Sequence, residues 1–248
     1  MRVRALLYAA GKGERLRPLT SHTPKPLLPV RGEAVAARTL RDLEGAGVEA
    51  VAINLHHLGS KIREAFGSSY AGLPLTYSEE SELLGSSGAL PPLRDFFAPA
   101  DLILLVNGDT LCDWPFEALI QRHVDARNAP ASVGGPPAAT VLLTSNPDPA
   151  AFGGGVGIDK TGRVLVFRGV NSMLPGHPKV AKRRVFAGAQ ILEPRLLERI
   201  PSGPGDLITV LYEPLLREGA AVLSLTTQRD WFDLGTPERY REAQESWS

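Results

Sequence analysis

The stretch VRALLYAAGKGERLRPLTSHTPKPLLPV, residues 3–30, joins a short apolar run to a long loop rich in glycine and proline. The run VRALLY (3–8) has the composition and length of a β-strand. The loop after it contains two closely spaced glycines, the cations Arg15 and Lys25, and four prolines. In an open α/β sheet, such a loop would lie at the carboxyl end of its strand, where these sheets bind ligands.

The loop has residues suited to phosphate binding but matches neither standard phosphate-loop motif. In the pattern GxGxxG the third glycine would fall on Leu16, and the Walker pattern is absent. Small residues from Ala9 to Gly13 would let backbone N–H groups approach a phosphate. Arg15 could bind phosphate oxygens in a bidentate fork, and Lys25 offers a mobile charge. On its glycines alone, an ordinary strand-to-helix connection is the better interpretation.

The first half of the chain alternates between predicted strands and predicted helices. Apolar runs predict strands at residues 3–8, 50–55, 73–78 and 101–109. Periodicity and capping residues predict helices at 34–45, 60–66, 89–96 and 116–127. The third is capped by GSSG (85–88), and its two prolines either restrict the helix start to the first turn or kink the helix. The unbroken apolar run at 101–109 is typical of a parallel strand covered on both faces. The order predicts an α/β protein with a mainly parallel sheet between helices.

The second half of the chain is richer in strands and turns. Apolar segments at residues 138–144, 154–167 and 183–192 predict added strands and hairpins over the sheet. They also predict a small lobe near 140–190. A helix at 206–219, a strand at 221–227 and a helix at 237–247 follow. No linker separates these parts, so we expect residues 1–248 to form a single domain.

Two aspartates lie where a metal ion could bind. Asp109 ends the strongest predicted strand, and Mg²⁺ in proteins is held by one or two carboxylates plus substrate phosphates. Asp233 lies between Phe232 and Leu234, a costly place for a carboxylate without a partner. The segment Gly235-Thr236-Pro237 that follows is explained by Thr236 as a helix cap, but this cap does not explain the aspartate. For Asp109, a structural aspartate in a turn is the alternative.

The composition excludes some functions. Lys plus Arg and Asp plus Glu both total 27, so binding to nucleic acid or to an anionic membrane is not supported. No stretch approaches the roughly 20 apolar residues that span a bilayer. The single cysteine, Cys112, cannot form an internal disulfide, which favours a reducing compartment, and we expect a cytoplasmic protein. The sequence does not specify the oligomeric state, so a homo-oligomer remains one of the alternatives.

Six blocks of the sequence together resemble the sugar-1-phosphate nucleotidyltransferase family. They are AAGKGERLRPLT, PKPLLPV, LLGSSGAL, VNGD, FAGAQIL and WFDLGTPERY, in this order between residues 9 and 240. The HTPKPLLPV and NLHHLG segments look most like mannose-1-phosphate guanylyltransferases and N-acetylmuramate-1-phosphate uridylyltransferases. The resemblance implies a Rossmann-like nucleotidyltransferase fold, with a nucleotide-binding half at about 1–130 and a sugar-binding, metal-completing half at about 131–248. It also implies that an NTP and a sugar 1-phosphate give an NDP-sugar and pyrophosphate, with Mg²⁺ as cofactor.

The resemblance implies roles for individual residues as well. Those implied for the nucleotide are Ala10, Gly11, Gly13, Gly85, Gly88 and Asp109. Arg15 would stabilise the departing pyrophosphate, and Lys25 would bind the α-phosphate. Asp109 and Asp233 would hold Mg²⁺, and Gly188 belongs to the block that approaches the sugar. A sugar phosphate is already ionised at neutral pH, so the absence of a GxSxG serine motif or a histidine zinc motif agrees with this chemistry.

The chain departs from the family pattern at two places. Many relatives carry LGTAG where this chain has LGSSG at 84–88, so the base is not specified. Many relatives also carry a Glu-Lys pair, which meets the sugar and its phosphate, after the strand that here ends at Arg168. Arg168 could replace the lysine as a sugar-site residue, but no glutamate stands beside it. The sugar is therefore not specified either.

Several functions stay open within this resemblance. We favour a mannose-1-phosphate guanylyltransferase-like enzyme over an N-acetylmuramate-1-phosphate uridylyltransferase or a glucose-1-phosphate thymidylyl- or uridylyltransferase. A cytidylyltransferase acting on phosphocholine or a similar ester would share the first block. A regulatory subunit that binds nucleotide sugars without catalysis is a further alternative. The presence of Arg15, Lys25, Asp109 and Asp233 together argues against that last alternative.

Overall fold

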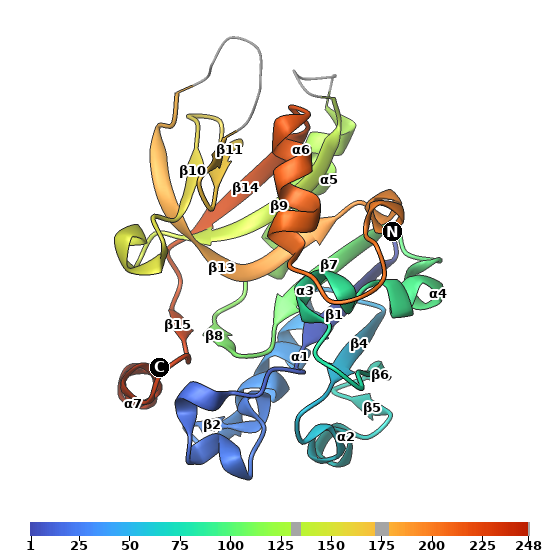
Figure 1. Cartoon of the computed structure of the whole chain (residues 1–248), viewed down its shortest axis with the longest axis vertical. Coiled ribbons are helices and arrows are strands. Elements are labelled where there is room, and N and C mark those ends of the chain that lie inside the picture. The colour runs from blue at the N-terminus through green and yellow to red at the C-terminus, as the bar shows by residue number, and fades with distance from the viewer. Residues whose placement is uncertain (130–134, 172–178, 248) are drawn as a thin grey trace.

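The fold is described for residues 1–129, 135–171 and 179–247 of a computed structural model. The strands of the main sheet are β1 (Val3–Tyr8), β4 (Ala50–Leu55), β5 (Ser69–Tyr70), β6 (Leu73–Glu79), β7 (Leu102–Asn107), β9 (Pro137–Thr144), β10 (Val156–Ile158), β11 (Val164–Phe167), β12 (Val170–Asn171), β13 (Lys182–Leu192) and β14 (Ala221–Thr227). Within the described residues nine of these eleven strands follow the order β12-β11-β10-β13-β7-β1-β4-β6-β5, while β9 pairs with β13 and with β14 (Figure 1).

The centre of the sheet is parallel, as the sequence predicts. Strand β1 lies between β7 and β4, and β4 pairs in parallel with β6. The register places Tyr8, the last residue of β1, beside Asn54 of β4 on one side and Asn107 of β7 on the other. Three polar side chains therefore meet at the carboxyl ends of three strands that are apolar elsewhere except at Arg4. The predicted α/β fold with a mainly parallel mixed sheet is confirmed.

The strands of the second half extend this sheet, so the prediction that they lie over it is wrong. Strand β13 runs antiparallel to β7 and continues outward to pair with β9 and β10. Figure 1 shows β13 curving from the central strands to the outer hairpin of β10 and β11. The physical reason is length, because a strand of eleven residues (Lys182–Leu192) reaches partners at both of its ends. The region near 140–190 is therefore built on the main sheet.

Helices cover both faces of the sheet. One face packs against α1 (Val35–Gly45), α2 (Gly59–Phe66) and α5 (Phe116–Asn128). The other face packs against α6 (Glu213–Arg217), the 3-10 helix η6 (Pro194–Arg199) and the segment from α3 (Gly85–Gly88) to α4 (Arg94–Phe97). Neighbouring residues of a strand point to opposite faces, so Leu7 belongs to the first core and Leu6 to the second.

Two predicted helices differ from the structure. The helix predicted at 89–96 is divided into the 3-10 helix η4 (Pro91–Leu93) and α4, because two adjacent prolines remove the N–H donors that an α-helix needs there. The helix predicted at 206–219 begins as a π-helix, η7 (Ile208–Tyr212), and becomes α-helical only in α6. Both changes lie on the same face of the sheet.

The C-terminal segment returns to the carboxyl edge. Strand β15 (Trp231–Asp233) pairs with β8 (Thr110–Cys112), and α7 (Pro237–Ser246) follows it. Helix α7 contacts the hairpin of β2 (Pro29–Val30) and β3 (Glu33–Ala34), where the Tyr240 hydroxyl and the Gln244 amide both donate to the carbonyl of Pro29 in β2. This packing fixes the end of the proline-rich loop. Within the described residues, no helix has the length and apolar composition needed to cross a membrane.

Candidate active site

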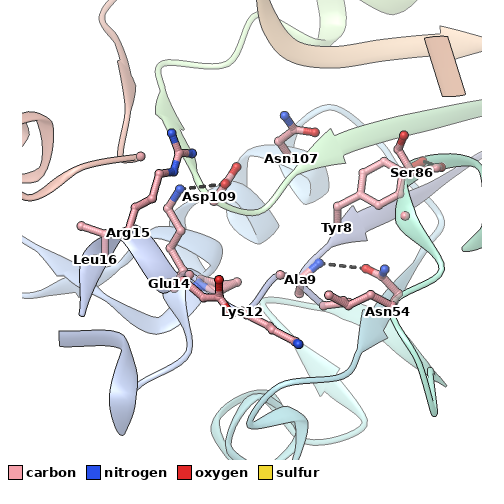
Figure 2. A pocket seen from close by; sticks show the side chains of 18 of the residues that line it. Tyr8, Ala9, Lys12, Glu14, Arg15, Leu16, Asn54, Ser86, Asn107 and Asp109 are labelled. Carbon is pink, nitrogen blue, oxygen red and sulfur yellow. Dashed lines mark hydrogen bonds and ion pairs between the residues drawn. The ribbon is translucent and has the colours of Figure 1, made fainter. Parts of the chain in front are cut away.

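A cavity of about 680 Å³ opens at the carboxyl ends of β1, β4 and β7. The predicted site residues that line it are Ala10, Gly11, Gly13, Arg15, Lys25, Gly85 and Asp109. In Figure 2, Arg15 and Asp109 lie on one side of the pocket, and Tyr8, Asn54 and Ser86 lie on the other. The fold thus brings together side chains that are up to about a hundred positions apart in the sequence.

The two glycines of the loop serve different purposes. Gly13 has a φ of 63°, and a Cβ there would lie 2.9 Å from Cγ2 of Thr20, so the fold itself requires glycine. The Thr20 hydroxyl in turn donates to the carbonyl of Gly13 over 2.7 Å. A Cβ on Gly11 would meet nothing within 4 Å. Since no described residue accounts for glycine at position 11, the open space beside it is available to a ligand.

Lys25 and Asp109 form an ion pair at the cavity wall. Lys25 opens the 3-10 helix η3 (Lys25–Leu27), and its Nζ lies 2.7 Å from Oδ2 of Asp109. The lysine side chain is 8% exposed and the aspartate side chain 43% exposed. A buried ammonium therefore depends on a carboxylate that stands at the edge of the open cavity. An incoming anion can compete for this ammonium without entering the core.

Asp233 lies next to this pair through the β15–β8 ladder. The register places Asp233 opposite Thr110, the residue after Asp109. Its carboxylate is paired with the Arg239 guanidinium of α7. A Cβ on Gly235 would lie 2.9 Å from Oδ1 of Asp233 and 3.2 Å from Nη2 of Arg15, so these two side chains border one small space that glycine keeps open.

The residues present fit a magnesium ion that would be bound partly by protein carboxylates and partly by substrate phosphates. Asp233 lies on β15, Asp109 lies in the turn directly before the partner strand β8, and the space kept open at Gly235 adjoins Asp233. Residues 1–129, 135–171 and 179–247 contain no cluster of three or more His, Cys, Asp or Glu side chains that could hold a metal. Two carboxylates completed by substrate phosphates and water are a usual set of ligands for Mg²⁺.

A buried polar network on the opposite side of the cavity was not predicted from the sequence. Asn54 Oδ1 accepts from the N–H of Ala9 over 2.8 Å, and Asn54 Nδ2 donates to Oε1 of Glu80 over 2.7 Å. Oε2 of Glu80 accepts from the N–H of Leu84 over 2.9 Å. Asn54 and Glu80 are 3% and 6% exposed. The network therefore joins the start of the glycine loop to the start of the 84–88 turn.

Tyr8 adds a second connection to the same turn. Its hydroxyl donates to the carbonyl of Ser86 over 2.6 Å. Burial of the hydroxyl, together with the negative charge of Glu80, raises the pKa of Tyr8 well above its usual range. The phenol therefore stays protonated and remains a donor. A sequence signal for this network exists in retrospect, because Asn54 is a lone polar residue near the carboxyl end of a fully buried strand.

The glycines of the 84–88 turn are required by close backbone contact. A Cβ on Gly85 would lie 2.4 Å from the carbonyl oxygen of Gly205, and one on Gly88 would lie 2.3 Å from that of Gly203. Both glycines face the 203–205 segment, and Gly85 lines the cavity as well. The two glycines therefore hold the turn against a neighbouring loop.

The two residues implied for the sugar lie outside the cavity lining. A Cβ on Gly188, at a φ of 96°, would lie 3.3 Å from Cβ of Asn107, so Gly188 stands directly behind a residue that lines the cavity. Arg168 occupies the turn between β11 and β12 and pairs with Asp206. Asp206 also accepts from the Ser86 hydroxyl over 3.3 Å. Arg168 is thus connected to the 84–88 turn through one carboxylate.

The family model described as Nucleotidyl transferase matches residues 4–248 of this sequence. The chain belongs to this family. Its predicted resemblance to the sugar-1-phosphate nucleotidyltransferases is confirmed. The mannose-1-phosphate guanylyltransferase catalytic subunit beta of Dictyostelium discoideum is 27% identical over 241 residues, which cover 96% of this chain and 62% of the relative. The UTP–glucose-1-phosphate uridylyltransferase of Synechocystis sp. is 27% identical over 254 residues, covering 97% and 62%.

Solved structures share the nucleotidyltransferase fold. HddC of Yersinia pseudotuberculosis, complexed with GMP-PN, has a TM-score of 0.74 and 21% identity, with 99% of each chain covered. A UDP-glucose pyrophosphorylase complexed with UDP-glucose has a TM-score of 0.76 and 17% identity, covering 100% of this chain and 98% of that one. At these identities the likeness concerns the fold. The present chain spans about 62% of the length of the curated relatives it matches.

Proposed function

We propose that the chain transfers a guanylyl group from GTP to mannose 1-phosphate or a closely similar hexose 1-phosphate, in a Mg²⁺-dependent reaction that releases pyrophosphate. The observation that carries the proposal is the convergence of the open Gly11 loop, Arg15, Lys25 and Asp109 on one cavity. Asp233 adds to it from β15, which pairs with the strand directly after Asp109. Cations suited to phosphate stand there beside carboxylates suited to Mg²⁺.

The proposed chemistry needs positioning and charge neutralisation from the protein. A sugar-phosphate oxygen attacks the α-phosphorus of the NTP, and the bond from that phosphorus to the bridging oxygen of the leaving pyrophosphate breaks. The attacking oxygen is already ionised at neutral pH, so no general base is required. When bound at Asp109 and Asp233, Mg²⁺ would supply further neutralisation of the phosphate charge.

Two cations of the loop have distinct parts in this proposal. Lys25 exchanges its bond with Asp109 for one with the α-phosphate, which is possible because the pair stands at the cavity edge. Arg15 lines the same cavity and neutralises the departing pyrophosphate. Ala10, Gly11 and Gly13 would offer backbone N–H groups to the triphosphate.

The choice of base and sugar rests on the relatives. The mannose-1-phosphate guanylyltransferase catalytic subunit beta of Dictyostelium discoideum is 27% identical to this chain, and the Oryza sativa protein named "Probable mannose-1-phosphate guanylyltransferase 1" is 28% identical. A uridylyl transfer from UTP to glucose 1-phosphate is the second candidate, because the Synechocystis uridylyltransferase is 27% identical as well. We place the sugar beside Gly188 and assign its phosphate to Arg168, which would first release Asp206.

A substrate matrix tests the proposal. Each of GTP, UTP, dTTP, CTP and ATP is combined with mannose, glucose and N-acetylmuramate 1-phosphates in the presence of Mg²⁺, and pyrophosphate release is measured. We expect the highest kcat/KM for GTP with mannose 1-phosphate. A higher value for UTP with glucose 1-phosphate would replace the guanylyl assignment by the second candidate. Tight binding of NDP-sugars without turnover in any combination would favour a regulatory subunit.

We also propose that the protein works in the cytoplasm, either as a single chain or as a homo-oligomer. Support for the location comes from Cys112, which is fully buried and whose pKa burial raises well above the usual range, as in a protein that keeps its thiol reduced and unreactive.

A further inference from the structure

We propose that Asn54 and Glu80 form a positioning bridge, which fixes the glycine loop at the correct distance from the 84–88 turn so that one nucleotide can be held at both ends. The inference rests on the nucleotide placement proposed above, but not on the identity of the base or the sugar. Its basis is the buried chain of hydrogen bonds from the Ala9 N–H through Asn54 and Glu80 to the Leu84 N–H.

The direction of every bond in this chain is determined by its two ends. The backbone N–H of Ala9 can only donate, so the side-chain oxygen of Asn54 faces it and the Asn54 NH₂ group faces Glu80. The backbone N–H of Leu84 also only donates, and it meets the second oxygen of Glu80. Both oxygens of Glu80 therefore accept, which is the arrangement of an ionised carboxylate.

Further bonds hold the bridge rigid. The N–H of Glu80 donates to the carbonyl of Leu55 over 2.8 Å, and its carbonyl lies 2.9 Å from Nδ1 of His56. Asn54 sits in the register position next to Tyr8 on β1. Tyr8 makes the second connection by donating to Ser86. A fully bonded buried network of this kind moves as one unit, because breaking any member leaves a buried polar group unpaired.

Charge attraction does not explain why a carboxylate lines this cavity. Glu80 lines the same cavity as the phosphate-binding candidates Arg15 and Lys25, and its negative charge would repel a triphosphate. The hydrogen bonds of Glu80 to Asn54 and Leu84 assign it a geometric use instead. A ligand that contacts only the glycine loop should not depend on the bridge, whereas a ligand that spans both loops should.

A charge-swapped pair tests the bridge. In Asn54→Asp two carboxylates face each other, and in Glu80→Gln the Asn54 NH₂ group and the Leu84 N–H must share a single acceptor oxygen. In the double variant Asn54→Asp/Glu80→Gln, the new carboxylate at position 54 accepts from the Ala9 N–H and from the new amide at position 80. The oxygen of that amide accepts from the Leu84 N–H. The number of hydrogen bonds, the side-chain lengths and the total charge are then those of the natural pair.

We expect each single variant to lower kcat/KM for the NTP by about 50-fold, since misplacement by an ångström can cost about a hundredfold in rate. The double variant should recover to within about fivefold of the natural enzyme, as expected for residues whose effects are coupled. Pyrophosphate, used as a probe that reaches only the glycine loop, should bind to Glu80→Gln with a Kd within about twofold of the natural value, because backbone contacts at the loop are unchanged.

Glu193→Gln is the matched control. Glu193 is a largely buried carboxylate whose Oε1 lies 3.1 Å from Nε2 of His123, directly after β13 and level with the amino end of β7. It should change the thermal midpoint Tm and leave kcat and KM unchanged. Where a single variant at the bridge does not fold, Tyr8→Phe removes the second connection and should lower kcat/KM by about fivefold, the usual scale of one lost hydrogen bond.

Three results would overturn the bridge. The first is a folded double variant that is no more active than Glu80→Gln, which would assign the Glu80 carboxylate a direct contact with the nucleotide. The second is a natural kcat/KM in both single variants. The third is an equal loss of pyrophosphate and NTP affinity in Glu80→Gln. If the natural chain turns over no NTP at all, the proposed function fails instead of the bridge.

Discussion

The two walls of the cavity hold their polar groups in different ways. On the Asn54 wall, formed by Tyr8, Asn54 and Glu80, the hydrogen bonds run between protein groups and the Asn54 and Glu80 side chains are buried. On the Lys25 wall, formed by Lys25 and Asp109, an ion pair stands at the cavity edge with nearly half of the aspartate side chain exposed. The first wall is prepared before any ligand arrives, whereas the second can exchange its partners.

This difference has an energetic basis. Opening a buried hydrogen-bonded network leaves unpaired groups that cost about 1–3 kcal/mol each. The Lys25–Asp109 pair instead joins a buried ammonium to a half-exposed carboxylate, so its contact can be exchanged for another negative charge, such as a phosphate that enters the cavity, but cannot simply be lost. Rigid geometry on one wall and exchangeable charges on the other suit a reaction in which the ligand brings both phosphates and a metal.

The largest expected effect comes from the two carboxylates proposed for the metal. Asp109→Asn and Asp233→Asn should each lower kcat by at least about 10³-fold, because several kcal/mol of charge stabilisation are lost with the ion. The measurements are pyrophosphate release and titration with Mg²⁺, with Tm as the check on folding. Asp113→Asn is the control, since Asp113 pairs with Arg229 and its side chain is 59% exposed.

A folded Asp109→Asn or Asp233→Asn variant with natural kcat and natural Mg²⁺ dependence would remove that residue from the metal site. If that variant is Asp109→Asn, the Lys25 wall would then be an ordinary structural ion pair. The contrast between the two walls would lose its chemical meaning.

The second effect concerns Lys25 itself. Lys25→Ala should lower kcat by about 100-fold and change KM for the NTP much less, because its contact with the α-phosphate strengthens in the transition state. Single-turnover kinetics separate this chemical step from binding. Lys160→Ala, at an exposed turn, controls for the loss of one positive charge. An unchanged single-turnover rate in Lys25→Ala would contradict the proposed exchange with Asp109.

Much of the central sheet could be predicted from local sequence. The apolar run that forms β7 and the alternation of strands with helices are sufficient for an α/β fold. Asp109 and the glycine loop could be placed at one edge because parallel strands end together there. Pro91 and Pro92 predict a disturbed helix, but how far they divide it depends on packing, which is not a local property.

The Asn54 wall could not be predicted, because it depends on strand order. Asn54 and Tyr8 are neighbours only because β4 pairs with β1. Glu80 reaches Asn54 only because β6 lies next to β4 in the sheet. The partners of Arg168 and Asp233 are set by contacts 38 and 6 positions away, and only the second is local. Long-range pairing also explains why β13 joins the main sheet rather than covering it.

A smaller effect concerns Asp42 on α1, a carboxylate that tests how costly burial is away from the cavity. Burial raises the pKa of Asp42 from 3.8 to about 6, with Arg38 opposing the change and Asp113 adding to it. The folded state then binds more protons than the unfolded state between these values, so stability falls as the pH rises from about 4 to about 6. A shift of this size corresponds to about 3 kcal/mol, which partial solvent exposure reduces to about 1 kcal/mol.

Asp42→Asn should therefore stabilise the protein by about 1 kcal/mol at pH 7 and have no effect at pH 3, below both pKa values. Urea unfolding of both proteins at the two pH values measures the difference. Equal stabilisation at both pH values would show that the gain arises from something other than the carboxylate charge.

The smallest effect concerns the partner of Asp233 in the absence of metal. Arg239 pairs with Asp233 and stacks over the ring of Phe152 with its guanidinium 4.6 Å from the ring centre. A cation held in this way competes with Mg²⁺ for the same carboxylate. Arg239→Met should therefore lower the Mg²⁺ concentration for half-maximal rate by about threefold, which corresponds to the free energy of a partly exposed ion pair. Arg241→Met is the control on the same helix, because Arg241 contacts Glu238 instead. A higher Mg²⁺ requirement in Arg239→Met would mean that Arg239 orients Asp233 for the metal, and a prepared element like those of the Asn54 wall would then lie beside the Lys25 wall as well.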